Sequence, residues 1–276
     1  MFRYLKASFQ RKKARRITRE YPPKIDFFDI EGIGKIEFAN WDNPLIAPIK
    51  LDSSLIKFFN QFIKEGDLAI DIGANIGDTT VPMALCTGPT GLTIGFDPNP
   101  YVFKILEKNS TLNKDKFRIE PLPYAISAKE EEFYFISSEA SFGNGAISPT
   151  KDSKHGKFIY PDKIRGVNLK KILEEKYSNW INKLAFIKID AEGYDKEIIK
   201  SITGLLTQYK PAIIAESFGK SSDDEKMELY EVIEKIGYDI FYFEDFKIEA
   251  EIKKLNDKTE MTKWKDTINI YALPKK

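Results

Sequence analysis

The sequence has few of the residues that build disulfides and metal centres. Cys86 is its only cysteine and His155 its only histidine. A single cysteine excludes an intramolecular disulfide and a thiolate metal site, and a reducing compartment is the simplest expectation. We therefore predict no metal site and look for chemistry in carboxylates and backbone groups.

Long apolar runs are also missing. No run of about 18 apolar residues is present to cross a bilayer, and the basic N-terminus is not followed by the apolar stretch of a signal peptide. We expect a soluble, cytoplasmic protein. With 42% apolar residues and only 16 glycines in 276 residues, the chain has material for one large α/β domain and no low-complexity tract.

The net charge of +1 conceals an uneven distribution. Residues 1–20 hold eight Lys or Arg against one acid, Glu20, which leaves the remainder negative. Residues 1–19 also contain apolar side chains such as Leu5 and Phe9. Three interpretations stay open: a helix in peripheral contact with an anionic membrane, an arm touching nucleic acid, or a solvated helix, which composition favours.

A β-hairpin is predicted after this arm. Apolar residues between 24 and 50 alternate loosely around Gly32 and Gly34, the pattern of two short strands joined by a tight turn. We expect the hairpin to cap the core of the α/β domain. The predicted organisation is an arm and cap over residues 1–50 and one α/β domain over residues 51–276.

The most informative stretch runs from Asp67 to Pro100. An apolar run breaks into a loop with Gly73 and Gly77, and a second apolar run, 92–96, follows a helical segment. We interpret this as strand, glycine loop, helix from near Ile76, and strand, the first half of a nucleotide-binding unit. The glycines let the backbone approach a ligand closely, and the helix points free N–H groups at it.

The acids around this loop indicate which ligand it binds. Asp97 ends the second strand, twenty residues beyond Gly77, where such units place a carboxylate that accepts hydrogen bonds from a ribose. The loop has Asn75 and no third glycine, unlike a dinucleotide fingerprint. Asp71 at the first strand's end would repel a pyrophosphate but suit a sulfonium. The loop therefore favours S-adenosylmethionine over NAD.

Further acids end two later strands. Asp190 and Glu192 follow the apolar run 184–189, and Glu216 follows the run 212–215. Ligands bind beyond the carboxyl ends of strands in open α/β sheets, so these acids should face the same crevice as the glycine loop. Asp190 is the first candidate base, Glu192 the second and His155 the third. Helix capping is the alternative for Glu192, loop exposure for His155, and a buried structural role for Glu216.

Three segments together carry a family resemblance. Asp71-Ile-Gly-Ala-Asn-Ile-Gly77, Asp97-Pro-Asn-Pro100 and Ile187-Lys-Ile-Asp190-Ala-Glu192-Gly-Tyr194 resemble the FkbM-type family of class I S-adenosylmethionine-dependent methyltransferases. The resemblance implies a Rossmann-like α/β fold with a seven-stranded, mostly parallel sheet and helices on both faces. To this the chain adds an N-terminal helix and the hairpin cap.

The resemblance also implies which residues form the site. The cofactor contacts it implies are Asp71, Gly73, Asn75, Gly77, Asp97, Ala125 and Asp190. Ala125 belongs to a segment that passes alongside the adenine, although a plain edge turn is the alternative. The acceptor contacts are Glu216, Phe142 and Asn144, the last two in the glycine-rich stretch 137–166, which we expect to form a lid.

The predicted activity is methyl transfer from S-adenosylmethionine to a hydroxyl of a sugar, glycan or small molecule. A sugar or glycan ranks first, and no nucleic-acid partner is expected. A nucleic-acid methyltransferase using the basic arm is the alternative, disfavoured because an Asn/Asp-Pro-Pro-Tyr/Phe motif is absent. A non-catalytic binding protein on the same fold also stays open. The sequence does not indicate the oligomeric state.

Overall fold

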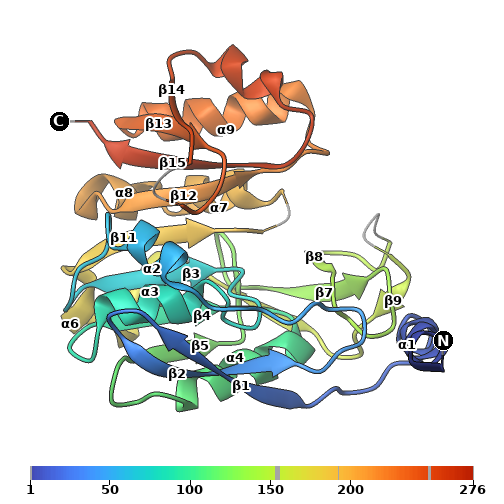
Figure 1. Cartoon of the computed structure of the whole chain (residues 1–276). Helices are drawn as coiled ribbons and strands as arrows, with labels where there is room; N and C mark the ends of the chain where they lie inside the picture. The colour runs from blue at the N-terminus through green and yellow to red at the C-terminus, as the bar shows by residue number, and fades with distance from the viewer. Residues whose placement is uncertain (1, 153–155, 192, 248–249, 276) are drawn as a thin grey trace.

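An eight-stranded sheet forms the centre of the computed structural model, which describes residues 2–152, 156–191, 193–247 and 250–275 (Figure 1). The strand order is β14–β13–β15–β12–β11–β3–β4–β5. The strands are β3 Leu68–Ile72, β4 Leu92–Phe96, β5 Ile119–Leu122, β11 Leu184–Ile189, β12 Ala212–Ser217, β13 Tyr238–Phe243, β14 Ile252–Leu255 and β15 Ile268–Pro274.

This sheet confirms the predicted fold class with one addition. β12, β11, β3, β4 and β5 run parallel, and β15 lies antiparallel between β12 and β13. These seven strands make the predicted sheet. The eighth strand, β14, extends its edge by pairing antiparallel with β13. Its sequence, Ile-Lys-Lys-Leu, is too short and polar to indicate a strand without that partner.

Helices cover both faces, as predicted. The helices α2 (Ser53–Phe59), α3 (Thr80–Thr87) and α4 (Pro100–Thr111) pack on one face, in an apolar cluster that includes Phe59 and Phe186. The opposite face buries Ile187 and Ile70 in a second cluster. That cluster is covered by α5 Leu169–Lys176, α6 Ser178–Ile181, α7 Asp195–Ser201, α8 Thr203–Tyr209, α9 Asp223–Lys235 and the 3₁₀ helix η1 Lys258–Lys263. No helix of the described residues is long and apolar enough to span a bilayer.

The N-terminal region contains the predicted helix and hairpin. Helix α1 covers Phe2–Ala14, and β1 (Pro23–Ile30) pairs antiparallel with β2 (Gly34–Trp41). The hairpin packs on α4, where the N–H of Ala39 donates to Asn109 Oδ1 at 2.7 Å. The hairpin thus covers the core through α4, and the residues after it, not its strands, reach the cavity described below. The boundary at residue 50 stays a prediction.

A smaller sheet lies beside the carboxyl ends of the parallel strands. It contains β6 (Ala125–Ile126), β7 (Glu131–Ser137), β8 (Ala146–Ser148), β9 (Phe158–Ile159) and β10 (Ile164–Val167). We expected residues 137–166 to be mostly loop. Three strands in this region, β8, β9 and β10, instead pair with β7. Such pairing between distant, short strands leaves little local signal. The lid role stays a prediction.

Candidate active site

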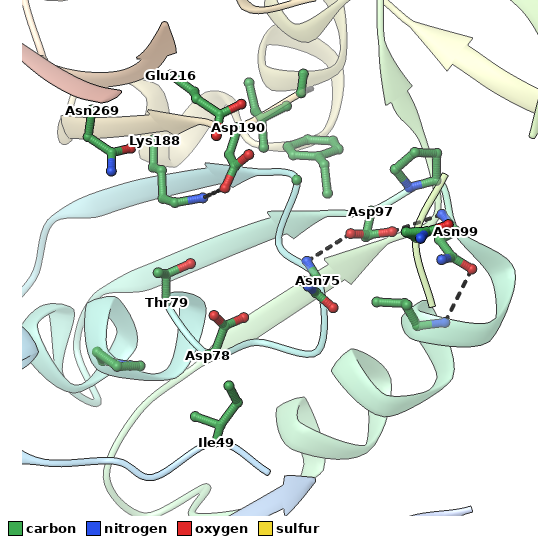
Figure 2. A pocket seen from close by; sticks show the side chains of 18 of the residues that line it. Ile49, Asn75, Asp78, Thr79, Asp97, Asn99, Lys188, Asp190, Glu216 and Asn269 are labelled. Atoms are coloured by element: carbon green, nitrogen blue, oxygen red, sulfur yellow. Dashed lines mark hydrogen bonds and ion pairs between the residues drawn. The ribbon is translucent and has the colours of Figure 1, made fainter. Parts of the chain in front are cut away.

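A cavity of about 600 Å³ opens where β3, β4, β11 and β12 end (Figure 2). This volume is typical of sites that enclose small molecules. The wall combines the glycine loop, the ends of the parallel strands, the small sheet and the segment after the hairpin. The lining residues fall mainly within 49–55, 72–82, 96–99, 124–126, 143–147, 188–198 and 245–247.

The glycine loop touches the Asp190 turn directly. Gly73 has φ +77°, and a Cβ added there would lie 1.9 Å from the carbonyl oxygen of Asp190. The N–H of Asp190 donates to Ile72 O at 3.0 Å, and the N–H of Gly73 donates to Phe96 O at 2.9 Å. The two acidic turns that the sequence places more than a hundred residues apart therefore meet, and only glycine fits between them.

The helix after this loop begins later than predicted. α3 starts at Thr80, not near Ile76. Asn75 and Gly77 have φ values of +46° and +98°, which an α-helix cannot contain. Gly77 does not line the cavity. A Cβ added at Gly77 would lie 3.3 Å from Leu106 Cδ1, so the residue permits close packing on α4.

Asp97 connects the loop to the next helix. Its Oδ2 accepts from the N–H of Asn75 at 2.7 Å, and its Oδ1 accepts from the N–H of Asn99 at 2.8 Å. Asn99, two residues further on, caps α4: its Oδ1 accepts from the N–H of Tyr101. Asp97 is thus held in place by backbone groups at the cavity wall (Figure 2).

The carboxyl of Asp97 suits a ligand with two neighbouring hydroxyls. Each oxygen accepts one backbone N–H, and a carboxylate has about four acceptor positions in total, so capacity remains for further donors. Burial raises the pKa of Asp97 to about 7, against the opposing effect of the N–H groups of Asn99 and Asn75. Hydroxyl donors from a ligand would stabilise the ionised form.

Asp71 lies beneath the loop and does not line the cavity. Its side chain is fully buried, and Oδ2 accepts from the hydroxyls of Thr79 at 2.8 Å and Thr80 at 2.7 Å. We expected this carboxylate to face the ligand. Because Asp71 alternates with Ile70 and Ile72 along β3, its side chain points into the face covered by α2, α3 and α4, where it secures the start of α3.

Lys188 is the main residue that our sequence reasoning missed. It is 4% exposed, lies opposite Asp71 in the β11–β3 register, and its Nζ is 3.1 Å from Asp190 Oδ2 and 3.5 Å from Asp71 Oδ1. Burial alone would lower the pKa of Lys188, but the carboxylates of Asp71, Asp190 and Asp78 outweigh it and raise the pKa. The sequence did contain one indication of this role, since Lys188 is the single charged residue in the apolar run 184–189.

Carboxylates gather at the end of the cavity opposite Asp97. Asp190, whose side chain is 44% exposed, and Glu216 lie near Lys188 and Asn269 (Figure 2). Asn269 pairs with Glu216 across β15 and β12 and lines the cavity. Nothing in the local sequence around Asn269 indicated this role, because it depends on the strand register.

Asp195 accepts hydrogen bonds from both segments that carry the cavity's acids, the one after β11 and the end of β12. Its Oδ1 accepts from the N–H of Glu216 at 3.0 Å and its Oδ2 from the N–H of Ala191 at 3.3 Å. Burial raises the pKa of Asp195 to about 7, with the first of these N–H groups opposing the shift. Asp195 does not line the cavity, so its role is to hold Asp190 and Glu216 in register.

The predicted residues of the small sheet divide between cavity and core. Ala125 and Asn144 line the cavity. Phe142 does not: it is 2% exposed, and its ring stacks on Tyr101 with centroids 5.0 Å apart. The φ of +55° at Phe142 turns its side chain into the small apolar cluster around Phe135. We therefore withdraw the direct acceptor contact for Phe142.

Two candidate bases, His155 and Glu192, lie outside the described residues. Among the residues that are described, no group of three His, Cys, Asp or Glu side chains is arranged to hold a metal ion.

Comparisons of the sequence with known proteins find methyltransferases. Residues 71–245 match the model of the methyltransferase FkbM domain. The hexuronic acid methyltransferase AglP of Haloferax volcanii is 25% identical over 212 residues, which cover 76% of this chain and 75% of that protein.

Solved structures resemble the chain in fold. The methyltransferase FkbM of Methylobacillus flagellatus KT aligns with a TM-score of 0.47 and 13% identity, over 79% of this chain and 50% of that one. An S-adenosylmethionine-dependent O-methyltransferase of Thermotoga maritima aligns with a TM-score of 0.44 and 12% identity, over 92% of this chain and 78% of that one. Neither alignment bears on the substrate.

Proposed function

The chain belongs to the FkbM family of class I S-adenosylmethionine-dependent methyltransferases, and on that premise we propose that it methylates a hydroxyl of a sugar or glycan. The observation that carries this proposal is the shared cavity: Asp190 and Glu216 occupy one end, and the glycine loop with Asp97 occupies the other. The relative named as a hexuronic acid methyltransferase supports a sugar acceptor.

The residues at the Asp97 end fit the cofactor. Asp97 would accept hydrogen bonds from the ribose hydroxyls, the loop at Gly73 and Asn75 would contact the amino-acid portion, and Ala125 would lie beside the adenine. When bound, S-adenosylmethionine supplies a methyl group on a positively charged sulfur, which is already a good leaving group. Little covalent chemistry is left for the protein, and alignment can contribute about 7 to 11 kcal/mol.

Asp190 is the group that we assign to take the acceptor's proton. The Asp190 carboxylate would receive the hydroxyl proton as the acceptor oxygen takes the methyl group that the bound cofactor would supply, with the neutral thioether as the leaving group. Lys188 contacts Oδ2 of Asp190, so we assign Oδ1 to the hydroxyl. The raised pKa of Lys188 keeps its ammonium protonated, so it orients Asp190 and does not act as the base.

The acceptor end matches a molecule with several hydroxyls. The carboxylates of Asp190 and Glu216 accept hydrogen bonds, and the amide of Asn269 both donates and accepts. Adjacent hydroxyls of a sugar would satisfy this mixture, whereas an apolar acceptor would displace water from these half-buried polar groups without replacing its hydrogen bonds.

Labelled methyl transfer tests the proposal. Calorimetry with S-adenosylmethionine, S-adenosylhomocysteine and NADH first establishes the ligand, and we expect the first two alone to bind. The protein is then incubated with methyl-labelled cofactor and neutral glycans, uronic-acid glycans or RNA. We expect label on a glycan, in a linkage that resists mild alkali as an ether does.

Two outcomes would contradict the assignment. A methyl group released by mild alkali would be an ester and would make the acceptor a carboxylate. Label on RNA and on no glycan would support the nucleic-acid alternative.

A further inference from the structure

The N-terminal helix has a charged, partly apolar outer face that the cavity chemistry does not use. Residues 1–20 contain eight Lys or Arg, and the single acid there, Glu20, pairs with Lys104. Between described residues, no ion pair involves the lysines and arginines of residues 5–19. Their charge is therefore available to an outside partner.

Helix α1 is attached to the protein along one side only. Ala14 is fully buried, Ala7 and Arg11 are half-buried, and these positions share one helical face. Just beyond the helix, the carbonyl of Arg15 accepts from the N–H of Ala140, in the segment that leads to the cavity wall. α1 stands at the rim of the molecule, apart from the main sheet (Figure 1).

The opposite side of the segment is apolar as well as basic. Leu5 is 57% exposed and Phe9 is 69% exposed, one helical turn apart, and Ile17 beyond the helix is 50% exposed. Lys12, Lys13 and the arginines that follow are exposed as well. Of the seven large apolar side chains exposed in the described part of the chain, three therefore belong to this short segment.

We infer that residues 5–19 dock the protein on a membrane surface rich in anionic lipid. Cationic side chains complement lipid phosphates, and Leu5 and Phe9 enter the boundary between headgroups and acyl chains. A nucleic-acid backbone would satisfy the charges but would leave those two side chains exposed to water. The membrane therefore accounts for both features of the face, whatever the methyl acceptor is.

Vesicle sedimentation tests this docking. The full chain is centrifuged with vesicles of phosphatidylcholine alone or mixed with phosphatidylglycerol, over a salt series. We expect binding to the mixed vesicles and little to the neutral ones. Phe9→Glu should weaken binding at least about tenfold by removing the inserted ring, and Lys12→Glu should weaken it about tenfold and reduce the salt dependence.

Matched controls change similar side chains elsewhere. Phe27→Glu removes an apolar side chain that is 56% exposed on β1, and Lys235→Glu reverses a lysine that is 75% exposed at the end of α9. Both should bind vesicles as the wild type does. All variants should retain affinity for S-adenosylmethionine, which shows that they are folded.

Two results would overturn the inference. One is the absence of binding to the mixed vesicles at low salt. The other is RNA binding that Lys12→Glu weakens, combined with vesicle binding that Phe9→Glu leaves unchanged, which would make the segment an electrostatic arm for nucleic acid.

Discussion

The two ends of the cavity are built in different ways. At the cofactor end, Asp97 is held by backbone N–H groups of Asn75 and Asn99, two positions in the same βαβ unit. At the acceptor end, Asp190 is held by the side chain of Lys188, which also reaches Asp71 on another strand. Local chain geometry thus determines one end, and side-chain pairing between strands determines the other.

We expect this difference between the two ends to separate cofactor binding from catalytic turnover. Changes at the acceptor end should alter the rate, changes at the cofactor end should alter affinity, and changes where the two ends meet should alter stability. The predictions below test this division from the largest expected effect to the smallest.

Asp190→Asn should reduce kcat between about a hundredfold and ten-thousandfold, because an amide cannot take the acceptor's proton. Affinity for S-adenosylmethionine should stay within about threefold, measured by calorimetry. Asp245→Asn is the matched control, since Asp245 also lines the cavity but pairs with Lys247. Equal turnover in wild type and Asp190→Asn would remove the base role.

Gly73→Ala should reduce the free energy of unfolding by about 4 kcal/mol and abolish cofactor binding, because the new Cβ would collide with the Asp190 carbonyl. Gly32→Ala is the control: its φ is +79°, close to that of Gly73, but nothing lies within 4 Å. That control should cost only about 1 kcal/mol. Similar losses in both variants, measured by denaturant unfolding, would show that backbone strain and not the collision matters.

Lys188→Met should reduce the free energy of unfolding by about 3 kcal/mol, because it leaves the buried Asp71 carboxylate without its cation. Asp71→Asn added to Lys188→Met should recover about 1 kcal/mol or more, which a double-mutant cycle would detect. Additive losses would mean that the two side chains do not interact.

Asp97→Asn should be more stable than the wild type by a margin that is about 2 to 3 kcal/mol larger at pH 8 than at pH 5. Burial raises the pKa of Asp97 from an ordinary 3.8 to about 7. The folded state therefore holds this proton more tightly than the unfolded state, and wild-type stability from this group falls as pH rises from about 4 to 7. One of the two N–H partners loses its acceptor at both pH values, a constant cost to the variant that leaves the pH dependence unchanged.

The same variant should lose at least about tenfold in affinity for S-adenosylmethionine. Asp195→Asn provides the comparison with the acceptor end, since the pKa of Asp195 is also raised to about 7 although the residue does not line the cavity. Asp195→Asn should show the same change of melting temperature with pH as Asp97→Asn, and its affinity for S-adenosylmethionine should be unchanged. An Asp97→Asn protein that binds the cofactor normally would place the ribose contact elsewhere.

The sequence predicted the roles of those site residues that lie close together along the chain. The glycine turn at Gly73 and the acid at Asp97 belong to one strand–loop–helix–strand unit, so their relation follows from its geometry. The same reasoning misplaced the start of α3, because left-handed residues at Asn75 and Gly77 extend the turn. It misplaced Asp71 because the alternation of side chains along β3 turns that carboxylate away from the cavity.

The sequence by itself determined the family, the cofactor and the order of the central parallel strands, because these depend on short motifs and on apolar periodicity along the chain. Only the tertiary structure decided that Lys188 joins Asp71 to Asp190, that Asn269 lies beside Glu216, and that Phe142 turns into the core. Those contacts depend on which strands become neighbours and in what register, and that follows from the packing of the whole sheet.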